Sequence, residues 1–173
     1  MTRDGTAMKI AKSCWRDNEG SALVEGAVLM PILFALMFGI FEFSWFFYQQ
    51  HMISAGLRDA ARYLTRSSSA CEPASTTWNV EETIAKNLAT TGFANGSIPR
   101  VRGWRAGMVT IRCTAIDNSV ATDGLRNYRG GDIIYIVTVS TRFSEPSLGF
   151  FRLLGLRSPV ISLSHSQRVI GPG

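Results

Sequence analysis

Residues 18–48 read NEGSALVEGAVLMPILFALMFGIFEFSWFFY, and this stretch decides the fold. Only seven of the 28 residues from Ser21 to Tyr48 fall outside the hydrophobic set, and no side chain from Gly26 to Phe41 is charged. A bilayer core of about 30 Å is crossed by about 20 mostly apolar helical residues. Soluble helices are rarely apolar on every face over such a length, so we expect a transmembrane helix over 21–48 rather than a buried core helix.

The rest of the chain is unlike this segment. The whole sequence has 173 residues, a net charge of +5, 46% hydrophobic and 18% charged residues, which excludes both a disordered chain and a polytopic membrane protein. Residues 1–20 form a polar leader with four basic and three acidic side chains, and this slight basic excess predicts a cytoplasmic N-terminus. A secretory signal peptide is the competing interpretation, but the apolar run is too long for one.

The leader meets the apolar run at Gly20-Ser21, and Glu25 follows four residues after Ser21. A glycine before a cleavage point lets a membrane-embedded protease approach the backbone closely. A carboxylate at the membrane edge is costly unless it is paired, and cleavage would create an amino group on Ser21 nearby. The alternative is that Glu25 only marks the start of a helix, where the positive end of the helix dipole stabilises a carboxylate.

The segment 19–66 reads EGSALVEGAVLMPILFALMFGIFEFSWFFYQQHMISAGLRDAARYLTR and resembles the N-terminal region of TadE-like proteins, the minor pseudopilins of the tight-adherence (Flp, type IV-like) pilus. Four features are shared. Gly20 is followed, after three residues, by Val24-Glu25, and the apolar run contains Pro31. A Gly-Ile-x-Glu-Phe motif stands at 39–43, and a helix rich in Ala, Arg and Tyr follows it.

The resemblance implies a role in assembly or initiation of an adhesive pilus. A prepilin peptidase would cut between Gly20 and Ser21, and Glu25 would meet the terminal amine of a neighbouring subunit. The partners implied are the prepilin peptidase, other pilins and pseudopilins, the inner-membrane assembly platform and membrane lipid. The protein would be a single-pass bacterial inner-membrane protein with a periplasmic head, incorporated in some cases into an extracellular pilus. Glu42 would either pair with a partner helix within the membrane or lie at its periplasmic edge.

The sequence after the apolar run predicts an α+β, pilin-like fold, in which the long helix packs on a small antiparallel sheet. Residues 49–66 continue the helix in amphipathic form, and residues 67–173 form the periplasmic head. Asn79 and Glu82 have capping-box spacing and predict the start of a short helix, with Val80, Ile84 and Leu88 facing the core, and Gly92 predicts its end.

Three alternating runs, 108–116, 133–143 and 158–170, predict strands. Residues 148–156 predict a short helix that closes the sheet or, less favoured, an interaction surface. Asp123-Gly124 and Gly130-Gly131 predict turns. The residues expected on one face of the first two strands are Val109, Ile111, Cys113 and Ala115, and then Ile133, Tyr135, Val137, Val139 and Phe143.

The chain has three cysteines, and one of them, Cys14, lies in the leader. Cys71 and Cys113 would share an oxidising compartment, so we expect a disulfide between them, with two buried free thiols as the alternative. The two histidines, His51 and His165, lack ligand spacing with this pair, so we predict no metal site.

Catalytic motifs are absent from the sequence, and we therefore expect neither an enzyme nor a bound cofactor. The arginines from Arg100 to Arg105 with Trp104 offer a weak nucleic-acid or cell-wall contact, but a solvated hairpin with an anchoring Trp is favoured, so no nucleic-acid partner is predicted. Arg58, Arg62 and Arg66 form a stripe that we interpret as a solvated face, the alternative being contact with anionic headgroups or acidic partners. Two other functions remain: an uncleaved membrane-anchored periplasmic binding or adaptor module, and a secreted soluble domain.

Overall fold

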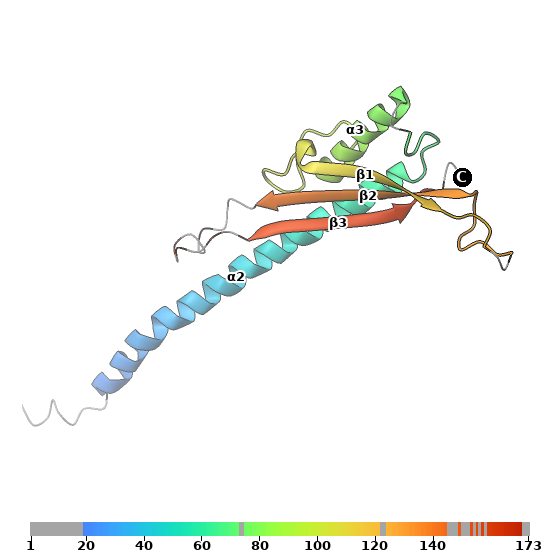
Figure 1. Cartoon of the computed structure of the whole chain (residues 1–173). Coiled ribbons are helices and arrows are strands. Elements are labelled where there is room, and N and C mark those ends of the chain that lie inside the picture. Colours follow the sequence, from blue (N-terminus) through green and yellow to red (C-terminus); the bar gives the residue numbers. More distant parts are fainter. Residues whose placement is uncertain are drawn as a thin grey trace, which may run out of the picture. The chain divides into compact units, whose positions relative to one another are not determined.

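The computed structural model describes residues 19–72, 75–121, 124–144 and 159–170, together with the single positions Gly149, Leu153, Gly155 and Arg157. Its elements are the helices α2 (Glu19–Leu64) and α3 (Thr76–Thr91), the 3-10 turn η1 (Ala106–Met108), and the strands β1 (Val109–Asp117), β2 (Ile133–Ser144) and β3 (Val160–Arg168) (Figure 1). This confirms the predicted α+β class, with a long helix and a small antiparallel sheet. The chain divides into two compact units, the first ending at Phe43 and the second, here called the head unit, beginning at Ser44.

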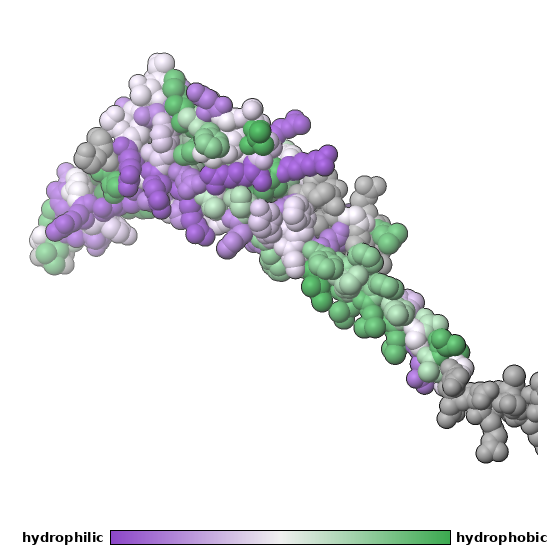
Figure 2. Space-filling view, turned by 180° about the vertical axis from the view of Figure 1, so that it is seen from behind, coloured by the Kyte–Doolittle hydropathy of each residue, from purple (hydrophilic) through white to green (hydrophobic). Residues whose placement is uncertain are grey.

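The first unit consists of the apolar half of α2. Its large apolar side chains are exposed, from 40% at Met37 to 77% at Leu23. Pro31 lies inside the helix, where it removes one backbone donor without ending the element. Among the described residues, α2 is the one helix that is long and apolar enough to cross a membrane. On the face shown in Figure 2, hydrophobic side chains line this helix, whereas hydrophilic residues are frequent on the head unit.

The head unit is a three-stranded antiparallel sheet in the order β1-β2-β3, with the second half of α2 and with α3 on one face (Figure 1). In this half of α2, apolar residues recur every three or four positions and so share one face of the helix. That face packs in the core of the head unit. On the apolar face of this part of α2, Ile53, Leu57, Ala60, Ala61 and Leu64 are all at most 1% exposed.

The two helices approach each other closely at Gly56. A Cβ atom at this position would lie 2.2 Å from the backbone oxygen of Ala89 in α3 and 3.0 Å from the ring of Trp104. Only glycine fits there without displacing α3.

Helix α3 begins three residues before the predicted start at Asn79. Its first turn is fixed by Trp78, which is 4% exposed, so the helix must already be formed before Asn79. Ala85 and Ala89 in α3 are also buried, whereas Val80 is 54% exposed. The prediction that Val80 faces the core is therefore wrong. The predicted end at Gly92 is confirmed: its φ is 85° and its N–H donates to the oxygen of Leu88.

Strand β2 buries the predicted residues only over part of its length. Val137, Val139 and Phe143 are buried, but Ile133 and Tyr135 on the same face are 57% and 38% exposed, because the core cluster stops at Val137. Ile134, on the opposite face, is buried instead, with Gly130 close to its side chain.

Strand β1 is less covered than its alternation predicts. Val109 is buried and Ile111 partly buried, whereas Cys113 and Ala115 are exposed. Strand β1 lies at one edge of the sheet, and among its residues only Val109 and Ile111 belong to the core cluster or pack against it.

A disulfide joins Cys71 to Cys113 and so ties the segment before α3 to strand β1. Cys71 has a φ of 68°, which is unusual for a residue other than glycine. The cysteine at position 14, the leader up to residue 18, the position 123 of the predicted Asp-Gly turn, and most of the segment 148–156 lie outside the described residues.

Candidate functional site

The predicted processing and assembly residues lie at the start of α2. The helix begins at Glu19, so Gly20 and Ser21 are in its first turn, and both are exposed. A Cβ atom at Gly20 would meet nothing within 4 Å. A side chain at this position would therefore meet no described neighbour.

Glu25 lies one helical turn after Ser21 and is exposed. Residues four apart share a face of an α-helix, so Ser21 and Glu25 point to the same side. An amino group created at Ser21 and the carboxylate of Glu25 would thus present opposite charges on one face of the helix, available to one another and to a neighbouring chain.

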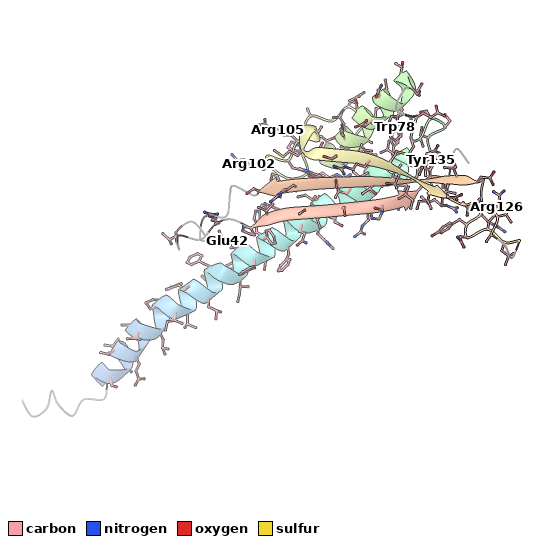
Figure 3. The ribbon with its side chains drawn as sticks, viewed as in Figure 1. Glu42, Trp78, Arg102, Arg105, Arg126 and Tyr135 are labelled. Atoms are coloured by element: carbon pink, nitrogen blue, oxygen red, sulfur yellow. A yellow bond between two sulfur atoms is a disulfide. The ribbon has the colours of Figure 1, made fainter. Side chains whose placement is uncertain are left out.

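Glu42 is half-buried and has an interaction partner. Figure 3 shows it on α2, far along the helix from the first turn. At a rise of about 1.5 Å per residue, the 17 positions from Glu25 correspond to about 26 Å of helix. The structure does not bring the two carboxylates together; they lie on either side of an uncharged stretch close in length to a bilayer core.

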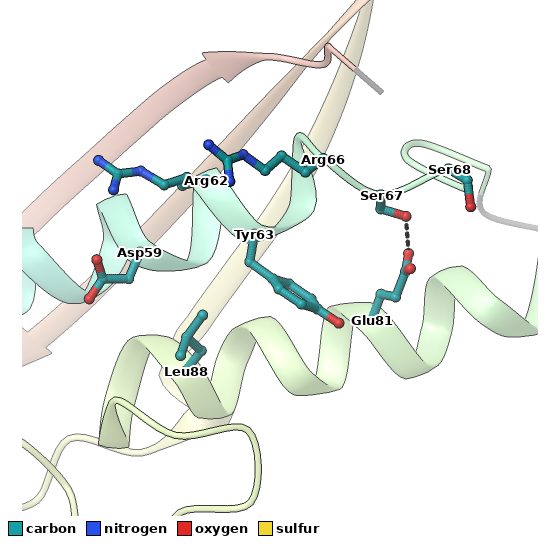
Figure 4. Close-up of a pocket in the computed structure, with 8 residues that line it drawn as sticks. All are labelled: Asp59, Arg62, Tyr63, Arg66, Ser67, Ser68, Glu81 and Leu88. Atoms are coloured by element: carbon teal, nitrogen blue, oxygen red, sulfur yellow. Dashed lines mark hydrogen bonds between the residues drawn. The ribbon is translucent and has the colours of Figure 1, made fainter. Parts of the chain in front are cut away.

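The head unit has a separate groove of about 610 Å³ between the end of α2 and helix α3 (Figure 4). Its lining residues are Asp59, Arg62, Tyr63, Arg66, Ser67, Ser68, Glu81 and Leu88. The Glu81 carboxylate accepts hydrogen bonds from the hydroxyls of Ser67 and Ser69. Burial, and secondly the negative charge of Glu81, raise the pKa of Tyr63.

The groove also contains an ion pair that joins α2 to the segment after α3. Asp59 forms an ion pair of 2.7 Å with Arg100, which holds the segment after α3 against α2. The described residues contain no group of three His, Cys, Asp or Glu side chains able to hold a metal ion. Arg62 and Arg66, two members of the predicted arginine stripe, are exposed at its rim.

In the segment Arg100–Arg105, the aromatic member of the candidate contact lies in the core, while Arg102 and Arg105 are exposed. Trp104 is fully buried and its indole N–H donates to the Thr141 hydroxyl at 3.0 Å, so the anchoring interpretation holds. Arg102 and Arg105 lie at one end of the sheet and Arg126 at the other (Figure 3).

Sequence reasoning missed the buried Asn118, which organises the connection between β1 and β2. Its amide group donates to the oxygens of Tyr128 and Gly131 and accepts from the N–H of Tyr128. A single Asn in a polar loop carries no periodic signal, so only the fold reveals this role. The ion pair of Asp59 with Arg100, 41 residues apart, was missed for the same reason.

Comparison with known proteins gives one finding for this chain. Residues 20–62 match the family of TadE-like proteins, which belong to the Tad pilus system. No curated protein and no solved structure matches the chain. The matched segment contains Gly20, Ser21, Glu25, Glu42 and almost all of α2. Over this segment the chain is similar to the TadE-like proteins of the Tad pilus system.

Proposed function

We propose that this protein is a minor pseudopilin that acts in assembly or initiation of the Tad pilus after a prepilin peptidase cuts between Gly20 and Ser21. The observation that carries the proposal is the coincidence of three features in one segment. The family match starts at Gly20, an exposed Glu25 follows one turn after Ser21, and an apolar helix exposed on all sides continues to Phe43.

The proposed arrangement places the leader in the cytoplasm, α2 across the inner membrane and the head in the periplasm. In this position the apolar side chains of α2 contact lipid or the helices of other pilins. The work of the protein is then helix packing and charge pairing, without chemistry of its own. After cleavage, the new amine of Ser21 and the carboxylate of Glu25 can pair between neighbouring subunits, which offsets the cost of each charge at the membrane edge.

The first experiment measures where the mature chain begins. The protein is purified from its native membrane, and its N-terminus is sequenced and its intact mass determined. A start at Ser21 supports the proposal, and a start at Met1 favours the uncleaved adaptor. A start beyond residue 50 would instead indicate a secreted domain and would refute the pseudopilin assignment.

The second experiment separates cleavage from assembly. Glu25→Ala is expected to be cleaved normally but to abolish pilus formation, measured by electron microscopy and by the pilin content of sheared cell surfaces. Glu72→Ala is the matched control, because Glu72 is an exposed carboxylate of the head unit, and it should assemble normally. Normal pili in the Glu25→Ala strain would show that this carboxylate makes no assembly contact.

A further inference from the structure

The face of the sheet that points away from α2 and α3 has an unusual composition. We call it the outer face, and the strand register defines it by the even-numbered positions of all three strands. Eight of these positions carry hydroxyl groups: Thr110, Thr114, Thr138, Ser140, Ser144, Ser162, Ser164 and Ser166. The others are Arg112, Arg142 and Arg168 and four aliphatic residues, Ile116, Ile134, Ile136 and Val160. The result is a flat surface of short polar side chains from which three arginines project.

The outer face carries positive charge without any negative counterpart, since none of its positions holds Asp or Glu. Arg112 and Arg142 are exposed, and among the described residues neither forms an ion pair. Arg168 is partly buried and is positioned by a hydrogen bond from its guanidinium to the oxygen of Arg129. The three guanidinium groups are therefore available to external anions.

The register also sets the spacing of these arginines. Arg112 pairs with Thr138, which pairs with Ser166, two residues before Arg168. With strands about 4.8 Å apart and a rise of about 3.3 Å per residue, the Cα atoms of Arg112 and Arg168 lie about 12 Å apart. Arg142 lies four residues along β2 from Thr138, so it is about 14 Å from Arg112. The charges are spread over the face and cannot all grip one small anion.

The composition argues against three kinds of occupant. A second copy docked face to face would bring arginines toward arginines. A globular acidic protein would find no aromatic anchor here, and a face of about 400 Å² is half the area that a partner buries in a standard interface. A membrane surface would find no aromatic side chain to insert, and of the four aliphatic residues only Val160 is exposed.

An extended, hydrated polyanion is complementary in charge and polarity to the outer face. Its repeating anionic groups can reach arginines about 12–14 Å apart, and a guanidinium binds a carboxylate through two parallel hydrogen bonds. Sugar hydroxyls can exchange hydrogen bonds with the rows of Ser and Thr, such as Thr138 and Ser166, whose hydroxyls lie 2.8 Å apart. We propose that the outer face of the sheet binds an acidic polysaccharide whose carboxylates pair with Arg112, Arg142 and Arg168. This proposal does not depend on processing at Gly20.

The test uses the full chain in detergent micelles and measures binding to immobilised polygalacturonate, with dextran as the neutral polymer and poly-L-glutamate as the acidic peptide. The variant R112Q/R142Q/R168Q is compared with R58Q/R62Q/R66Q, which removes the same charge from α2. We expect the wild type to bind polygalacturonate but not dextran, with an affinity that falls as salt increases. The outer-face variant should bind at least about tenfold more weakly, and the α2 variant less than about twofold.

Three outcomes would overturn the proposal: no binding of polygalacturonate by the wild type, equal or tighter binding of poly-L-glutamate, or an equal loss in both variants. The second outcome would assign the face to an acidic protein, and the third would reduce the effect to net charge. If the triple variant does not fold by circular dichroism, Arg142→Gln replaces it. Because Arg142 makes no ion pair among the described residues, that variant should fold and lose about threefold in affinity.

Discussion

Gly56 is the residue on which the packing of α2 against α3 depends. Gly56→Ala would place a Cβ atom 2.2 Å from the backbone oxygen of Ala89, so α3 must move away from α2. We expect a loss of about 2 kcal/mol in the free energy of unfolding, since overpacking typically costs 1–3 kcal/mol. Chemical denaturation followed by tryptophan fluorescence measures it. Gly107→Ala is the matched control, because its Cβ would meet nothing within 4 Å, and it should change stability little.

Asn118 has a comparable role in the connection between β1 and β2. It is 1% exposed, and its side chain makes three hydrogen bonds to backbone groups. Asn118→Ala leaves these groups without partners, and we expect a cost of about 2–3 kcal/mol. Thermal unfolding checks this, with Ser119→Ala, an exposed neighbour, as the control. A change in melting temperature of equal size in both variants would contradict the role assigned to Asn118.

Tyr63 gives the head unit a dependence on high pH. Its pKa is raised above the ordinary value of 10.0, first by burial and then by the Glu81 carboxylate. Because the pKa of Tyr63 is higher in the folded than in the unfolded state, the protonated phenol contributes to the free energy of unfolding. This contribution is complete below pH 10 and is lost as the pH rises through the pKa of the folded state. In an absorbance titration at 295 nm, Tyr63 should ionise at a higher pH than free tyrosine does. Glu81→Gln should bring this transition to lower pH, but not to that of free tyrosine, because burial remains. A Glu81→Gln transition that is unchanged or moved upward would contradict the assigned effect of the carboxylate.

At the scale of elements, α2, the end of α3 and the three strands follow from periodicity and from Gly92. The misplaced predictions share one physical cause. Val80 and Tyr135 fit the apolar pattern of their elements, but burial depends on where the neighbouring layer ends, and that is a property of tertiary packing. The start of α3 was misplaced because the buried Trp78 outweighs the capping signal at Asn79.

At the candidate site, Gly20, Ser21 and Glu25 could be named from the sequence, because their spacing along one helix depends only on neighbouring residues.

The disulfide between Cys71 and Cys113 links the segment before α3 to strand β1. It closes a loop of 42 residues in sequence separation, and Cys113 lies on the exposed half of an edge strand. The double variant Cys71→Ser/Cys113→Ser should lower the free energy of unfolding by about 4 kcal/mol, the value that chain entropy gives for a loop of this length. Treating the wild type with a reductant should lower its melting temperature similarly. A reduced wild type that melts like the oxidised protein would show that the bond does not stabilise the fold.

At the scale of the whole molecule, the hydrophobic core belongs entirely to the head unit. The residues that form it or pack against it begin at Phe46, and the first unit ends at Phe43. A chain that starts at Ser44 therefore keeps every core contact while it loses the apolar side chains that would lie in lipid. We expect this fragment to be soluble without detergent and to melt within a few degrees of the full chain, measured by the near-ultraviolet circular dichroism of Trp78 and Trp104. A fragment that starts at Leu57 lacks Ile53 and Gly56 and should not fold cooperatively, because it loses the contact surface of α3. If the Ser44 fragment itself were unfolded, the apolar half of α2 would have to contribute to the stability of the head.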